Sequence, residues 1–144
     1  MMNVELFKEA QFTEAELDRL NLLFWCLAWV FHTSPLDDYL RGILLNNLVD
    51  PAGGDPGWYL NLISRREAAD YSEQWDACIV HSSHPELGCY EAWALADISG
   101  IEPETAYYTV EEVRHYIRLA LDNIAQQHPE RTKEVQEVIA RYRL

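Results

Sequence analysis

A run of ten apolar residues, 22–31, constrains the fold of this chain more than any other feature. Ten residues are about half of the ~20 that a helix needs to cross a bilayer, so the run predicts a helix buried in a protein core. Thr13 and Glu16 precede it with the spacing of a capping box, which marks a helix N-terminus. After Leu22 this helix is apolar nearly all round, which is typical of the central helix of a bundle.

Further helix signals follow along the chain. Ser34 and Pro35 are typical of a helix start, and apolar residues at helical spacing extend this second helix to Leu48. Thr109 and Glu112 form a second capping box in front of a long amphipathic helix. The other predicted elements are helices over residues 58–69 and 72–80, a final helix opened by Pro129, and a breaker-rich loop at residues 50–57.

The middle of the chain fits two interpretations. Glu, Ala and Leu in residues 89–96 favour helix, whereas residues 77–80 and 89–90 fit short strands that flank a loop. The sequence therefore predicts an all-α fold, a single-domain bundle of about six helices over residues 1–144. The alternative is a mainly α fold with a small β-hairpin around residues 77–96.

Length and composition bound the class of protein. With 144 residues, 49% of them hydrophobic, the chain can bury a core and is not expected to be disordered. Its 24 acidic and 11 basic residues give a net charge of −13, which argues against direct binding to nucleic acid or to a membrane, because phosphate contacts need Lys and Arg. No basic leader precedes an apolar stretch at the N-terminus, and three sparse cysteines fit reduced thiols, so the expected location is cytoplasmic.

The negative charge is concentrated in residues 72–109. This stretch holds seven acidic residues and no Lys or Arg, whereas residues 110–144 hold six of each sign. Aromatic side chains beside carboxylates indicate a surface for a basic protein, because the rings anchor a partner and the charges speed its encounter. The competing interpretation is a buried Trp75 and Trp93 with a solvated acidic face. The predicted partner-binding residues are Glu73, Trp75, Asp76, Glu86, Tyr90, Glu91, Trp93, Asp97, Glu102, Glu104, Tyr107 and Tyr108.

Four residues in this stretch are candidate zinc ligands, namely Cys78, His81, His84 and Cys89. Their spacing lacks the two short-spaced pairs of a structural zinc site, so the favoured interpretation is a core cysteine with two loop histidines and no bound metal or cofactor. Thiol catalysis by Cys78 with His81 is disfavoured, because the surrounding carboxylates would raise the thiol pKa. Glycine-rich phosphate loops and the common hydrolase motifs are absent from the sequence, which predicts a protein that is not an enzyme.

Residues 71–75 (YSEQW), 90–97 (YEAWALAD) and 109–113 (TVEEV) give the second half of the chain a family resemblance. It resembles bacterial immunity proteins of polymorphic toxin systems, including those of contact-dependent growth inhibition. Such proteins are small, usually acidic and cytosolic, and each binds and blocks a cognate toxin domain. The resemblance implies a toxin partner and no catalytic residues.

The leading hypothesis is therefore an immunity protein that neutralises a basic toxin domain, often a nuclease, through the surface of residues 72–109. A first alternative is an acidic DNA mimic that inhibits a restriction or CRISPR enzyme. A second is a small metal-dependent enzyme that uses the two cysteines and two histidines. The sequence leaves the oligomeric state open.

Overall fold

A four-stranded antiparallel sheet organises the fold, with the strands in the order β1-β2-β3-β4. The computed structural model of the chain describes residues 6–32, 35–45, 52–54, 57–64 and 72–144. The strands are β1 (Gly53–Gly54), β2 (Trp58–Ile63), β3 (Cys89–Ala94) and β4 (Thr105–Thr109). The fold is mixed α/β, so the prediction of an all-α bundle is wrong.

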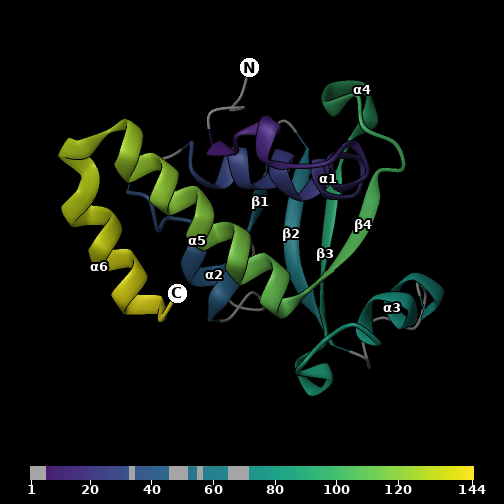
Figure 1. The fold of residues 1–144 in the computed structure, drawn as a ribbon. Coiled ribbons are helices and arrows are strands. Elements are labelled where there is room, and N and C mark those ends of the chain that lie inside the picture. The colour runs from purple at the N-terminus through teal and green to yellow at the C-terminus, as the bar shows by residue number, and fades with distance from the viewer. Residues whose placement is uncertain (1–5, 33–34, 46–51, 55–56, 65–71) are drawn as a thin grey trace.

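Helices cover one face of this sheet and lie at its ends (Figure 1). They are α1 (Glu14–Val30), α2 (Leu40–Leu44), α3 (Ser72–Ile79), α4 (Ala96–Ser99), α5 (Val110–Gln127) and α6 (Thr132–Tyr142), with 3₁₀ turns η2 (Glu9–Gln11), η4 (Pro85–Leu87) and η5 (Pro129–Arg131). Figure 1 shows α1 and α5 crossing the same side of the sheet, with α6 next to α5 and α3 at the lower end of β3 and β4. The main hydrophobic core lies between α1, α5 and the sheet face that they cover.

The two predicted capping boxes are confirmed. The Thr13 side chain accepts a hydrogen bond from the Glu16 N–H, and the Glu16 carboxylate accepts one from the Thr13 N–H. Thr109 and Glu112 make the same pair of bonds at the start of α5. Each box satisfies two of the backbone donors that a helix N-terminus leaves unpaired, so these two helix starts are set by local sequence.

The apolar run of residues 22–31 is buried as predicted, but against a sheet. Leu23, Cys26, Leu27 and Val30 are fully buried, and α1 contacts β2, β3 and β4. A sheet face supplies the same apolar cover as neighbouring helices would. No helix in the described part of the chain combines the length and apolar character that crossing a membrane requires.

Both interpretations of the middle of the chain need correction. Residues 72–79 are helical, which confirms the predicted helix, so residues 77–80 do not pair with β3 in a hairpin. Residues 89–94 form the central strand β3, and residues 58–63 form β2 in place of the predicted helix over 58–69. Long-range pairing of these two strands overrides the helix propensity of Ala, Glu and Leu in β3.

Two other predicted elements are recovered in part. The second helix is shorter than expected: turns precede α2, and Ser34 and residues 46–51 lie outside the described residues. Pro129 opens η5, and α6 follows from Thr132. Within the predicted loop of residues 50–57, Gly53 and Gly54 pair with β2, and residues 50–51 and 55–56 lie outside the described residues.

Gly88 and Gly100 provide a matched test of the turn that leads into β3. Both have positive φ, but a Cβ on Gly88 would collide with the Ile63 carbonyl oxygen, whereas a Cβ on Gly100 would meet nothing within 4 Å. We expect Gly100→Ala to lower the free energy of unfolding by about 1–2 kcal/mol, the cost of a left-handed alanine. Gly88→Ala should lower it by clearly more, as measured by urea unfolding. Equal losses would contradict the packing of Gly88 against β2.

Candidate partner-binding surface

The sheet has a second face, opposite to α1 and α5, which we call the outer face. Side chains alternate along a strand, so the residues next to the core-facing Leu60, Ala92 and Tyr108 point to this side. The outer face consists of Tyr59, Asn61, Ile63, Cys89, Glu91, Trp93, Thr105, Tyr107 and Thr109, brought together by the strand register. Helix α3 covers only one end of it, where Trp75 packs on Cys89 and Ile63 and donates its indole N–H to the Ile63 carbonyl at 3.0 Å.

Glu91 lies at the centre of the outer face and is only 6% exposed. The Tyr59 hydroxyl donates to its Oε1 at 2.5 Å, and the Tyr107 hydroxyl donates to its Oε2. A buried carboxylate needs such donors, because burial without them costs several kcal/mol, on the order of the desolvation penalty of an ion. These two hydroxyls therefore fix the carboxylate in the middle of the sheet.

Aromatic rings and a second acceptor surround this carboxylate. Trp93 stacks on Tyr59 with ring centroids 5.4 Å apart and an interplanar angle of 23°, and both side chains are half-buried. Asn61 lies opposite Glu91 in the register, and its buried Oδ1 has no hydrogen-bond donor among the described residues. Among the described residues, the part of the outer face beyond α3 thus exposes parts of aromatic rings, with the buried oxygens of Glu91 and Asn61 between them.

Exposed carboxylates lie at both ends of the outer face. Glu73 and Asp76 belong to α3 at one end, and Asp97 belongs to α4 at the other end, where Glu102 is also exposed (Figure 1). Glu104, also at this end, is half-buried and accepts a hydrogen bond from the Ala96 N–H at 2.6 Å. Glu86 is exposed in η4. With no Lys or Arg in residues 72–109, nothing within this stretch neutralises the carboxylates.

Three of the predicted partner-binding aromatics lie in the interior. Trp75, Tyr90 and Tyr108 are each at most 2% exposed. The Tyr90 hydroxyl donates to the Ile43 carbonyl at 2.5 Å, the Tyr108 hydroxyl donates to the Arg19 carbonyl at 2.7 Å, and burial raises the pKa of both phenols. These three residues therefore support the fold and leave Trp93 and Tyr107 as the predicted aromatics that reach the surface.

Sequence reasoning missed Tyr59 and Asn61. Both were assigned to a helix, but residues 58–63 alternate between the two faces, with Trp58, Leu60 and Leu62 in the main core and Tyr59 and Asn61 outside it. Residues 58–63 are mostly aromatic or branched, which is typical of a strand. Assigning alternate residues of this segment to opposite faces could have located β2 and its outer-face side chains.

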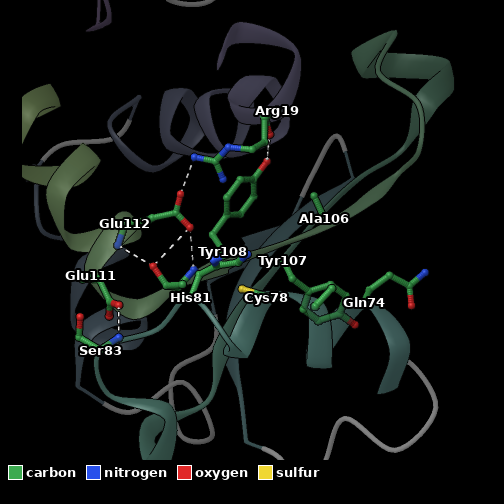
Figure 2. A pocket seen from close by; sticks show the side chains of 12 residues that line it. Arg19, Gln74, Cys78, His81, Ser83, Ala106, Tyr107, Tyr108, Glu111 and Glu112 are labelled. Atoms are coloured by element: carbon green, nitrogen blue, oxygen red, sulfur yellow. Dashed lines mark hydrogen bonds and ion pairs between the residues drawn. The ribbon is translucent and has the colours of Figure 1, made fainter. Parts of the chain in front are cut away.

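A pocket of about 750 Å³ lies beside the edge strand β4, between α1, α3 and the start of α5 (Figure 2). Arg19 forms an ion pair with Glu112 at 2.5 Å on one wall, and Glu111 accepts a hydrogen bond from the Ser83 N–H at 2.5 Å on another. Cys78 lines the pocket from α3 (Figure 2). The carboxylates of the pocket are thus already engaged by groups of the chain itself.

The structure brings together only two of the four candidate zinc ligands. The Cys78 and Cys89 thiols share a hydrogen bond, whereas His81 and His84 are exposed, and His84 lies 3.6 Å from Glu86. Among the described residues, no three His, Cys, Asp or Glu side chains gather in a way that could hold a metal ion. The hydrogen bond to Cys89, burial and the nearby Glu112 raise the pKa of the Cys78 thiol, which disfavours it as a nucleophile.

Comparison with known proteins adds no relative to this description. No protein-family model matches the chain, and neither a characterised protein nor a solved structure shows significant similarity to it. The function must therefore be argued from the outer face itself.

The hydrogen bonds to Glu91 can be tested by removing the donors. We expect Tyr59→Phe and Tyr107→Phe each to lower the free energy of unfolding by about 1.5–3 kcal/mol, because each leaves a buried carboxylate oxygen without a donor. Tyr39→Phe is the matched control, since Tyr39 packs its ring on Trp58 and makes no hydrogen bond through its hydroxyl among the described residues. Urea unfolding measures all three, and a loss in the control as large as in the other two would contradict this role of the phenols.

Proposed function

We propose that this chain binds and neutralises a basic protein, in the manner of the immunity proteins of polymorphic toxin systems that its second half resembles. The observation that carries the proposal is the outer face: an aromatic surface centred on the buried carboxylate of Glu91, with exposed carboxylates at both ends that form no ion pair among the described residues. A surface of this composition is complementary to a patch of Lys and Arg side chains that also offers apolar contact area.

The two kinds of side chain would act differently on binding. Trp93 and Tyr107 expose part of their rings, which suits them to anchor a partner and to stack on its cationic side chains. Glu73, Asp76 and Asp97 are exposed at the ends of the face, where they would attract a basic protein over a distance set by the ionic strength. In a nuclease toxin, these carboxylates would take the positions that substrate phosphates otherwise occupy.

A binding role is better supported than the two alternatives. The raised pKa of Cys78 does not support catalysis with Cys78 as the nucleophile, and the exposed, separated histidines do not support a metal site. Residues 110–144, which form α5, η5 and α6, carry equal numbers of acidic and basic residues. The C-terminal quarter of the chain therefore carries no net charge, whereas a DNA mimic needs carboxylates spread at phosphate-like intervals over a long surface.

The test is co-expression of the full chain with the product of the neighbouring reading frame. We expect a stoichiometric complex with a basic toxin domain and rescue of growth when both are expressed. A neighbour that is neither basic nor toxic, together with no basic protein captured by the purified chain, would overturn the proposal. Capture of a restriction or CRISPR enzyme instead would favour the DNA-mimic alternative.

Variants of the outer face then separate anchoring from attraction. We expect Trp93→Ala to raise the Kd for the toxin about tenfold or more, mainly through faster dissociation. The combination Asp76→Asn with Asp97→Asn should mainly slow association, with an effect that shrinks as salt is added.

Glu137→Gln is the matched control, because Glu137 is an exposed carboxylate of α6 that lies outside the proposed surface. Surface plasmon resonance at two salt concentrations measures the rates, and circular dichroism checks the fold of each variant. An equal effect of the control on association would indicate a response to total charge and not to this surface.

A further inference from the structure

Two of the three cysteines meet across the junction between α3 and the sheet. Cys78 lies in the last turn of α3 and Cys89 is the first residue of β3, and their thiols are in hydrogen-bond contact. Trp75, Ile63 and Tyr107 pack around the pair and form a small hydrophobic cluster separate from the main core. The two sulfurs are thus held together by elements on either side of the loop of residues 80–88.

The pair is open to small molecules from one side. Cys78 is half-buried and lines the pocket beside β4, whereas Cys89 is fully buried beneath it. A reagent that enters the pocket therefore meets the Cys78 sulfur first, because Cys78 is the cysteine of the pair that lines it (Figure 2). The pocket thus gives a small reagent a path to the pair, and the two sulfurs are close enough for one to resolve the oxidised form of the other.

The third cysteine lies in a different environment. Cys26 sits on α1, on the opposite side of the sheet, and is fully buried. Its thiol faces the backbone carbonyls of Tyr59 and Trp93 at 3.5 Å and 3.8 Å, and burial raises its pKa. A neutral, enclosed thiol is inert towards oxidants, which makes Cys26 the internal reference for the other two.

We infer that Cys78 and Cys89 form a reversible disulfide when the protein meets a peroxide. The Cys89 sulfur, as the thiolate, attacks a peroxide oxygen, the O–O bond breaks, and this sulfur becomes a sulfenic acid. The second sulfur then forms the S–S bond and displaces hydroxide, which takes up a proton. Overall, two thiols and one hydrogen peroxide give one disulfide and two waters, so the sulfurs are oxidised and the peroxide is reduced.

The ionisation of the pair supports this chemistry. The hydrogen bond from the Cys78 thiol lowers the pKa of the Cys89 thiol, and the same bond raises the pKa of Cys78. One proton therefore leaves the pair more easily than from an isolated buried thiol, and the second is retained. Glu111 and Glu112 oppose this ionisation, so the site should react more slowly than a thiol in a basic environment.

The test uses the purified full chain, reduced, freed of reductant and treated with hydrogen peroxide. We expect a mass loss of about 2 Da and a fall from three titratable thiols to one after denaturation, both reversed by dithiothreitol. No Lys or Arg lies between the two cysteines, so trypsin cannot separate them, but a glutamate-specific protease cuts after Glu86. The two resulting fragments should stay joined until the sample is reduced.

Two variants complete the test. Cys78→Ser should abolish the mass loss, and Cys26→Ala should form the bridge as the unchanged protein does. Addition of oxygen atoms without loss of 2 Da, a bridge that includes Cys26, or bridged fragments in Cys78→Ser would each overturn the inference. Because Cys78 is half-buried at a pocket wall, its replacement is expected to leave the fold intact, which circular dichroism checks.

Discussion

The packing of α1 against the central strand β3 is the contact on which the rest of the structure depends. The strand presents Ala92 and Ala94 to the helix, and both are fully buried. With such short side chains between them, the helix comes near enough for the Cys26 thiol to lie 3.5 Å from the Tyr59 carbonyl of β2. The apolar run of α1 is thereby buried, and the small residues of the strand match the bulk of the helix.

This contact also decides the chemistry of the opposite face. Because side chains alternate along β3, Ala92 and Ala94 on the core side place Glu91 and Trp93 on the outer side. A carboxylate in the middle of a sheet is tolerated there only because Tyr59 and Tyr107 supply hydroxyl donors from the two neighbouring strands. The polar centre of the outer face is therefore a consequence of the strand register that the core imposes.

Whether a feature of the fold could be predicted from the sequence depends on how far apart in the chain the residues that determine it lie. The capping boxes at Thr13 and Thr109 were predictable, since each depends on residues three apart, as was the burial of residues 22–31. Strands β2 and β3 were not, because each is stabilised by a partner about 30 residues away, whatever the helix propensity of its own residues. The acidic stretch follows directly from the composition, but Tyr107 is half-buried and its neighbour Tyr108 is buried, a difference that only the register could assign.

Helix α3 links the proposed surface to the cysteine pair. It brings Glu73 and Asp76 to the outer face, and its attachment to the sheet consists of Trp75 over Ile63 and of Cys78 against Cys89. This small cluster buries far less apolar surface than the main core, so α3 is the element whose position would respond most to a covalent bond. A disulfide there would fix two exposed carboxylates relative to Glu91, and the only residue of the outer face that it would change is Cys89, at the end that α3 covers. The proposed binding of a basic partner and the proposed oxidation of the pair thus depend on different side chains, and α3 is the element through which one would act on the other.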